Sequence, residues 1–305
     1  MVKMNPGRKQ KVMTMNEAIS YIGDGCFLAI GGFMIHNHPM AIIRELVKRR
    51  IKDLKVLPTP PGGSVDVDLL IGSGCATSII ASYIGGEWLE PVMPNYRRKV
   101  ERSELEILEY DEHTIICGLR ASIQKLPCEV TRSGIGTDLL KVNPFLKVFN
   151  NPITGEPLVA VPPIEPDVAI LHAQRSDPYG NIQHAGSAFM DILLASASKK
   201  VIVSVEEVVP LDYIKKDPFK TTIPCHLVTA IVELPYGAHP CSSHGCYTFD
   251  EDHIRKYVQC ARHPDRFQEY LNQYIHGIEN LYEYLELIGG VKRLCDLRLH
   301  QEMKQ

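Results

Sequence analysis

Short apolar runs, typical of buried strands, alternate along the chain with segments whose residue pattern is typical of helices. The apolar runs cover residues 26–33, 54–58, 76–82, 105–110, 167–173, 200–208 and 226–234. The helical segments cover residues 15–23, 39–50, 66–72, 94–105, 112–125, 187–198, 250–261 and 264–287. Strands and helices that alternate at these lengths predict βαβ units, and hence an open α/β fold with a mainly parallel sheet and flanking helices.

Several residues mark the expected ends of these elements. Asn16 is the expected N-cap of the first helix, and Pro39 suits the first position of the second. The Gly-Gly pair at 289–290 is expected to end the last helix. Proline and glycine surround one predicted strand in residues 150–166, so we expect a single domain over residues 1–305 with a possible subdivision at that segment.

The composition argues against several classes of protein. Of the 305 residues, 45% are hydrophobic and 23% charged, with a net charge of -3, which disfavours a nucleic-acid or membrane-surface binder. The nine cysteines are scattered and form no CxxC pair. No apolar run approaches the roughly 18 residues of a membrane span, and no secretory signal pattern precedes the first helix. We therefore expect a reduced, cytoplasmic protein.

The first predicted strand ends in a glycine pair, within the stretch DGCFLAIGGFMIHNHP at residues 24–39. In an open α/β sheet, ligands bind at the carboxyl ends of strands. Gly31 and Gly32 leave backbone amides uncovered there, so a carbonyl or phosphate oxygen could approach closely. The spacing is not GxGxxG, which disfavours a dinucleotide site. The alternative interpretation is a tight turn without a ligand.

The same stretch resembles the N-terminal signature of the family I CoA-transferases, which here consists of Asp24-Gly25, an apolar strand, Gly31-Gly32-Phe33 and Pro39. Asn37 stands where that family usually has a glycine. Further stretches are similar, in the same order, to the A subunits of glutaconate CoA-transferases, at residues 11–19, 68–74, 126–131, 151–162, 167–182, 203–208 and 235–240. The resemblance extends over nearly the whole chain and implies the family I CoA-transferase fold.

The resemblance implies an enzyme subunit that moves CoA between carboxylic acids, glutaconate-like or other dicarboxylates. In that family a glutamate attacks the acyl-CoA and forms first an anhydride and then a glutamyl-CoA thioester. The CoA thioester is a substrate, and neither a metal nor a permanently bound cofactor is implied.

The family's glutamate lies in a Ser-Glu-Asn-Gly motif of the B subunit, and this tetrapeptide is absent here. The nearest string, Ser204-Val205-Glu206-Glu207, is similar to an A-subunit segment, and its acidic pair is alternatively a plain strand end. The resemblance therefore implies a heterodimer or heterotetramer in which a B subunit completes the site.

Candidate site residues gather around three predicted strand ends. Gly31 and Gly32 are expected to contact the thioester and hold its oxyanion, and the remaining candidates for substrate binding are Phe33, Arg132, Ser133, His172, Gln174 and Asn181. Arg132 could pair with a carboxylate or a CoA phosphate, or it could be a solvated loop residue. His172, Gln174 and Asn181 follow buried strand residues and would face the glycine edge, or else they satisfy loop backbone groups.

The stretch LEYDEHTIICGL at residues 108–119 leaves a second function open. It resembles the A subunit of ring-opening CoA-thioester hydrolases of steroid degradation more closely than it resembles the transferases. In those hydrolases an acidic residue of the A subunit does the chemistry of C–C cleavage of a cyclic diketone, and Glu112 matches it. Alternatively, Asp111 and Glu112 cap the helix 112–125. A third possibility is a non-catalytic CoA-binding scaffold.

The stretch HPCSSHGC at residues 239–246 contains two histidines and two cysteines. Zinc ligands are drawn from these residue types, but the spacing is not that of a finger or knuckle. The matching segment of the glutaconate CoA-transferases is similar and implies no metal, so we expect none.

Overall fold

The computed structural model describes residues 9–60 and 62–303, and within them an eight-stranded sheet forms the centre. Its strands run in the order β11-β10-β8-β1-β2-β3-β4, with β9 paired to β8. All neighbours along this order are parallel, and β9 is antiparallel. The strands are β1 (Phe27–Ile30), β2 (Leu54–Pro58), β3 (Ala76–Ala81), β4 (Glu106–Glu109), β8 (Val168–Ser176), β9 (Ile182–Gln183), β10 (Lys200–Val208) and β11 (Ala230–Glu233). The predicted open, mainly parallel sheet is confirmed.

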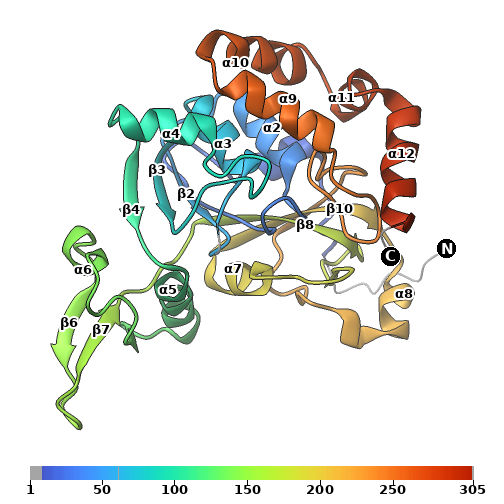
Figure 1. Cartoon of the computed structure of the whole chain (residues 1–305). Coiled ribbons are helices and arrows are strands. Elements are labelled where there is room, and N and C mark those ends of the chain that lie inside the picture. Colours follow the sequence, from blue (N-terminus) through green and yellow to red (C-terminus); the bar gives the residue numbers. More distant parts are fainter. Residues whose placement is uncertain (1–8, 61, 304–305) are drawn as a thin grey trace.

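Helices cover both faces of the sheet (Figure 1). One face carries α2 (Met40–Lys48), α3 (Val65–Gly72), α4 (Pro94–Glu101), α9 (Glu251–Ala261) and α10 (Pro264–Leu271), and the other carries α5 (Glu112–Gln124) and α7 (Asp191–Ala197). Side chains alternate between the two cores, so Leu28 and Ile30 pack under the first group and Ala29 under the second. Burial on both faces explains why the strands read as continuous apolar runs.

The strand order reverses at β1 and β8. The chain leaves β1 towards β2, β3 and β4, and later enters β8 on the other side of β1 before continuing to β10 and β11. Ile30 pairs with Ile170, which places His172 level with Gly32 just beyond β1. In open α/β sheets, ligands bind outside the carboxyl ends of strands at such a switch point. The fold therefore places the candidate site next to Gly31 and Gly32.

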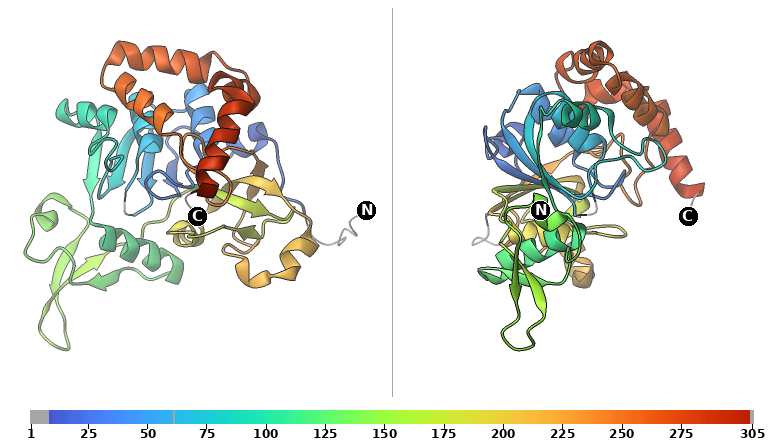
Figure 2. Two further views of the ribbon diagram at one scale, coloured as in Figure 1. Left: turned by 45° about the vertical axis from the view of Figure 1, so that its right-hand side comes forward. Right: turned by 60° about the vertical axis from the view of Figure 1, so that its left-hand side comes forward.

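A small antiparallel sheet projects from the body as an arm (Figures 1 and 2). Its strands β5 (Glu129–Thr131), β6 (Lys147–Asn150) and β7 (Pro157–Val161) run in the order β5-β7-β6, and α6 (Leu139–Val142) lies within it. Sequence reasoning expected one strand in residues 150–166 and missed β5 and β6. β6 is exposed along its length and so shows no buried-strand pattern. The subdivision at 150–166 stays a prediction.

Several expected element ends are wrong by one or more residues, among them those of the helices 15–23, 94–105 and 187–198 and of the strand 226–234, which are shorter in the structure. The strand predicted over 26–33 ends at Ile30, because Gly32 adopts a φ of 95° and turns the chain. Pro39 is the N-cap of α2 rather than its first residue. The helix α1 (Met15–Ile19) is capped by Thr14, whose hydroxyl accepts from the amide of Glu17, and not by Asn16.

The long helix predicted over 264–287 is also wrong. After α10, the chain makes a π-helical turn (Asn272–His276), and α11 (Leu281–Leu287) begins after its N-cap Asn280. The Gly-Gly pair separates α11 from a further helix, α12 (Gly290–Met303), which the sequence pattern did not reveal. The remaining helices are α8 (Leu211–Lys216) and the short 3₁₀ helix Pro218–Lys220. No helix among the described residues is long and apolar enough to cross a membrane.

Candidate functional site

The turn after β1 is packed so closely that only glycine fits. A Cβ on Gly31 would lie 2.4 Å from Oδ1 of Asp191 and from Cδ2 of Leu171. A Cβ on Gly32 would lie 2.7 Å from the carbonyl oxygen of His36, and the positive φ at this position favours glycine as well. The glycine pair therefore places the backbone directly against the side chain of Asp191.

The amides of this turn all donate within the chain. Gly31 N donates to the carbonyl of Ile170 at 3.0 Å, and Phe33 N donates to the carbonyl of His36 at 2.8 Å. Gly32 N donates to Oδ1 of Asp191 at 2.9 Å. Only the Gly32 amide is held by a side chain, which could turn away. Oxyanion binding by Gly31 and Gly32 stays a prediction, and it requires Asp191 to release the Gly32 amide.

Two buried histidine–carboxylate contacts flank the turn. Nδ1 of His38 lies 2.9 Å from Oδ2 of Asp66, and Nε2 of His184 lies 3.3 Å from Oδ2 of Asp191. Neither contact has the alignment of a hydrogen bond. Burial opposes a charge on His38, but the Asp66 carboxylate outweighs it and raises the pKa of His38. His38 in turn lowers the pKa of Asp66 against the opposing effect of burial, so each group favours the charged form of the other.

His172 belongs to a buried network in the middle of β8 and β10, where it pairs with Ser204. Its Nδ1 is 2.9 Å from Oγ of Ser204, and its Nε2 is 2.9 Å from Oε1 of Glu206. The same carboxylate oxygen accepts from the hydroxyl of Tyr247 at 2.7 Å. The His172 side chain is 0% exposed. His172 lies beside the glycine turn, as its sequence position predicted, and both of its ring nitrogens contact groups of its own chain.

Gln174 and Asn181 also bind their own chain. Nε2 of Gln174 donates to Oδ1 of Asn37 and to Oγ of Ser243, each at 3.0 Å. Nδ2 of Asn181 donates to Oδ2 of Asp177 at 2.6 Å, which fixes the turn after β8. These contacts support the alternative in which such side chains satisfy loop groups. Substrate contact by His172, Gln174 and Asn181 stays a prediction.

A row of aromatic rings lies beside the glycine turn, formed in order by Phe33, Phe189, His244, His36, Phe249 and Trp88. Phe33 and Phe189 stack with their centroids 4.5 Å apart. Trp88 is 61% exposed at the other end. Burial lowers the pKa of His36 to about 4, and it also lowers the pKa of His244. At neutral pH both imidazoles are uncharged, so the row is aromatic and neutral.

Glu112 lies in a different pocket, at the carboxyl end of β4. The pocket has a volume of about 720 Å³, and Ser133 also lines it. Asp111 is the N-cap of α5 and accepts from the amide of Thr114 at 2.9 Å, while its other oxygen accepts from the hydroxyl of Ser133 at 3.0 Å. Glu112 is exposed in the first turn of α5. The capping role is confirmed for Asp111, and Glu112 remains available in the pocket.

Arg132 does not reach either place. Its side chain is 71% exposed and forms an ion pair with Glu156 at 2.5 Å. The structure thus brings the turn Gly31–Phe33 at the end of β1 beside His172 and Gln174 within β8. It brings Glu112 and Ser133 together at the end of β4. The two groups share the carboxyl edge of one sheet.

The segment 239–246 packs against the glycine turn. Oγ of Ser242 lies 2.6 Å from Nδ1 of His36. Nδ1 of His239 is 2.8 Å from the hydroxyl of Tyr284, and Nε2 is 3.0 Å from Asp250, so both ring nitrogens are engaged. Among the described residues, no three histidine, cysteine or acidic side chains are placed together to hold a metal ion.

Comparison with known families identifies this arrangement. The sequence profile of the coenzyme A transferase family matches residues 12–234, more than half of the chain. The chain belongs to the coenzyme A transferase family.

Individual relatives match along nearly the whole chain. The A subunit of the glutaconate CoA-transferase of Acidaminococcus fermentans is 32% identical over 95% of both sequences. The crystal structure of that glutaconate coenzyme A-transferase matches with a TM-score of 0.90 and 31% identity, covering 94% of this chain and 95% of the other. The A subunit of the 3-oxoadipate CoA-transferase of Pseudomonas knackmussii is 34% identical over 92% of this chain and 99% of its own length.

A hydrolase component is similar as well. The cholesterol ring-cleaving hydrolase IpdA subunit of Rhodococcus jostii is 28% identical over 90% of this chain and 95% of its own length. Both resemblances expected from the sequence are confirmed, and this coenzyme A transferase family member is homologous to A subunits of both kinds.

Sequence reasoning missed several groups of the site. Asp66 lies in a helix and pairs with His38, which is 28 residues away in the sequence. Asp191 accepts from the amide of Gly32, which is 159 residues away in the sequence. The only sequence signal was the polar cluster Asn37–His38 directly after the glycine turn. Tyr247, which completes the network of Glu206, lies outside every predicted strand.

Proposed function

We propose that this chain is the A subunit of a heteromeric CoA-transferase, a heterodimer or heterotetramer in which a B subunit supplies the nucleophilic carboxylate. The supporting observation is the state of the chain's own acidic groups at the switch point. Asp66 and Asp191 are buried, the Glu206 side chain is 9% exposed, and all three are engaged by histidine, backbone or tyrosine partners. A nucleophile must reach the acyl carbon of the thioester, and these carboxylates do not face a free surface.

In the proposed reaction the partner's carboxylate attacks the thioester carbonyl, which gives a mixed anhydride and CoA thiolate. The thiolate attacks the enzyme-side carbonyl of the anhydride, so that the first acid leaves and CoA remains as a thioester on the partner. A second carboxylic acid reverses both steps and departs as the new acyl-CoA. In this scheme Gly31 and Gly32 form the wall beside the acyl group, and the Gly32 amide binds the oxyanion once Asp191 turns away.

The substrates that we propose are CoA thioesters of glutaconate-like or other dicarboxylic acids. The similarity to glutaconate and 3-oxoadipate transferase subunits supports this class. A panel of mono- and dicarboxylic acids as CoA acceptors, assayed with the complete complex, tests it by comparing kcat/KM values. Equal kcat/KM for mono- and dicarboxylic acids would contradict the proposed class.

Which subunit carries the nucleophile is tested by comparing the activity of the chain alone with that of the complex that it forms with a B subunit. The chain alone is expected to show only background transfer from acyl-CoA to acetate. In the complex, borohydride added during turnover should reduce the thioester and leave a modified glutamate on the partner chain. Robust transfer by the lone chain would overturn the proposal.

A second function, ring-opening hydrolysis of a CoA thioester, is favoured by one observation. Glu112 is exposed in a pocket of about 720 Å³ at the carboxyl end of β4, where a substrate could reach it. A carboxylate in that position could act as a general base. Under this function, borohydride would trap nothing on either chain.

We also propose that the protein works in the cytoplasm. All nine cysteines are unpaired in the structure. Disulfides are the usual state of cysteine-rich proteins in oxidising compartments. Cell fractionation followed by thiol counting tests this location.

A further inference from the structure

Arg44 is a buried cation without an anionic partner among the described residues. Its side chain leaves the middle of α2 and is 7% exposed. Nη1 donates to the carbonyl of His239 at 2.6 Å, and the guanidinium carbon lies 3.8 Å from the ring centroid of Tyr284. Nη2 is buried and has no hydrogen-bond partner in the described part of the chain. Buried charges are ordinarily paired, so this donor is unmatched.

The acidic group of the adjoining network does not supply the missing partner. Asp250 accepts from the guanidinium of Arg293 and lies 3.0 Å from Nε2 of His239. These two partners lower the pKa of Asp250 against the opposing effect of burial. These contacts engage Oδ2, and Oδ1 accepts from Arg293 and from the amide of His253 at 3.0 Å. Both carboxylate oxygens are therefore committed, and Arg44 has no acidic partner among the described residues.

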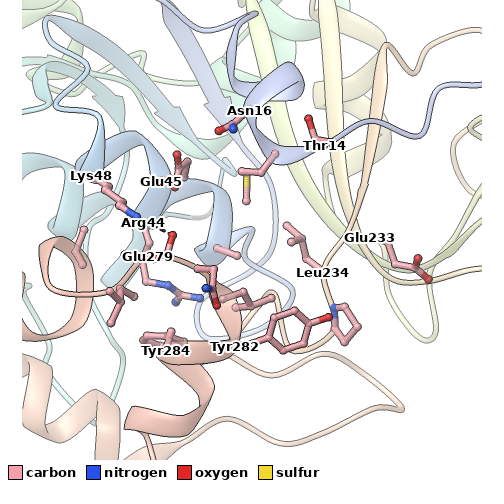
Figure 3. A pocket seen from close by; sticks show the side chains of 17 residues that line it. Thr14, Asn16, Arg44, Glu45, Lys48, Glu233, Leu234, Glu279, Tyr282 and Tyr284 are labelled. Carbon is pink, nitrogen blue, oxygen red and sulfur yellow. Dashed lines mark hydrogen bonds between the residues drawn. The ribbon is translucent and has the colours of Figure 1, made fainter.

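Arg44 lines a pocket enclosed by α1, α2, the residues after β11, and α11 (Figure 3). The pocket has a volume of about 470 Å³. Much of its wall is apolar and consists of Met15, Ala41, Leu234, Pro235, Ile275, Ile278 and Leu281. Figure 3 shows the guanidinium of Arg44 over the ring of Tyr284 on the inner side of the pocket. A concave pocket that combines a largely apolar wall with a few charged groups is typical of a small-molecule site.

Acidic side chains also line this pocket and restrict the ligand. Glu45 is held by Arg49 at 2.7 Å, and Glu233 accepts from the amide of Val208 at 2.8 Å. Glu279 lines the same pocket and is exposed. Lys48 also lines it, and its ammonium donates to the backbone carbonyl of Glu279 at 2.8 Å. Three carboxylates thus face two cations, Arg44 and Lys48, so the lining carries a net negative charge. A second negative charge on a ligand would meet this acidic lining at close range and be repelled. The pocket therefore favours one carboxylate next to Arg44 and an uncharged remainder.

We propose that this pocket binds a monocarboxylic acid with an apolar body. One carboxylate oxygen accepts from Nη2 of Arg44, and the apolar body lies against Leu234 and Ile278. A guanidinium–carboxylate hydrogen bond is charge-assisted, and at a buried site it is stronger than the same contact in water. The site is separate from that of the proposed CoA transfer, whose dicarboxylic acids carry the second negative charge that this pocket disfavours.

The pocket is physically connected to the glycine turn. Arg44 holds the carbonyl of His239, the first residue of the segment 239–246. Ser242 of this segment contacts His36, and Ser243 lies 3.0 Å from Nε2 of Gln174. A ligand on Arg44 thus acts on a segment that packs directly against the candidate site.

The test measures binding to the full chain by calorimetry in the absence of CoA. The probe is octanoate, and the comparison compounds are octanol, the dicarboxylate suberate and inorganic phosphate. We expect octanoate to bind at least about tenfold more tightly than each of the other three, and Arg44→Gln to weaken it by about tenfold or more. The matched control is Arg255→Gln, which changes an exposed arginine of α9 and should leave octanoate affinity unchanged.

Each other result would overturn the proposal. Absence of octanoate binding, equal binding of octanol, suberate or phosphate, or unchanged affinity in a folded Arg44→Gln protein would each do so. Circular dichroism establishes whether that variant folds. If it does not, Ile278→Trp decides the question, since it fills the apolar part of the pocket and leaves Arg44 in place. Undiminished octanoate binding by Ile278→Trp would exclude the site.

Discussion

Gly31 lies where any side chain would collide with the group that organises the site. A Cβ at this position would be 2.4 Å from Oδ1 of Asp191, so Gly31→Ala must displace a carboxylate that holds the Gly32 amide. We expect Gly31→Ala to lower the free energy of unfolding by about 1–3 kcal/mol, as measured by urea denaturation. Gly23→Ala is the matched control, because nothing lies within 4 Å of its added Cβ. Equal effects of the two substitutions would contradict this packing.

The histidines beside the glycine turn give folding stability a definite dependence on pH. Burial lowers the pKa of His36 from 6.5 to about 4, so the unfolded chain binds a proton in this window while the folded chain does not. The free energy of unfolding should therefore keep its full value, as far as His36 is concerned, above pH 6.5 and fall as the pH drops towards 4. Unfolding curves of His36→Asn should show a shallower fall than wild type, and those of the exposed His113→Asn should not. An unchanged pH profile of His36→Asn would contradict the lowered pKa.

Individual site residues were predictable only where the strand pattern placed them. Gly31 and His172 lie in the predicted strands 26–33 and 167–173, so their arrival side by side follows from parallel pairing. Asp66 and Asp191 sit in helical segments, and no local pattern indicates which polar helix residue turns towards the sheet edge. Their partners are distant in sequence, and tertiary packing alone brings them together.

At the scale of elements, α1 offers a direct test of how a short helix is anchored. The hydroxyl of Thr14 accepts from the amide of Glu17, and the Glu17 carboxylate accepts from the amide of Thr14, which forms a capping box. Thr14→Ala should lower the free energy of unfolding by about 1 kcal/mol. Asn16→Ala is the control, since the Asn16 side chain contacts an exposed arginine and not the helix, and it should cost less than about 0.5 kcal/mol. A larger loss for Asn16→Ala in urea unfolding would reverse the assignment of the cap.

Elements were predictable where burial produces a clear pattern. The strands at 54–58 and 200–208 match β2 and β10, both of which bury side chains in the cores on the two faces of the sheet. β6 of the arm is exposed on every residue, so its sequence lacks the apolar run that marks the central strands. The break between α10 and α11 was missed because the π-helical turn between them buries Tyr274 and Ile275 and continues the apolar pattern.

At the scale of the whole molecule, one sheet edge carries two candidate reaction sites. The first, at β1 and β8, is lined with buried and mutually engaged groups and would take its nucleophile from another chain. The second, at β4, presents Glu112 on a surface that the arm also borders through Ser133. The parallel sheet fixes both at its carboxyl edge, and their order along the edge follows from the strand order. A substitution of Glu112 therefore tests which of the two sites carries out the reaction.

Glu112→Gln decides between the two functions, because it keeps the size and hydrogen-bonding capacity of the side chain and removes its basicity. If the complex is a transferase, the nucleophile is on the partner and Glu112 only borders a pocket, so kcat/KM should fall roughly tenfold or less, about 1.4 kcal/mol of barrier. If the complex is a ring-opening hydrolase, loss of the general base should lower kcat on the order of 10³-fold. Glu109→Gln is the matched control, since Glu109 is exposed and lines the same pocket. We expect the small effect, together with a trapped glutamate on the partner chain. A dead Glu112→Gln enzyme with an active Glu109→Gln enzyme and no trapped thioester would instead assign the chemistry to this chain.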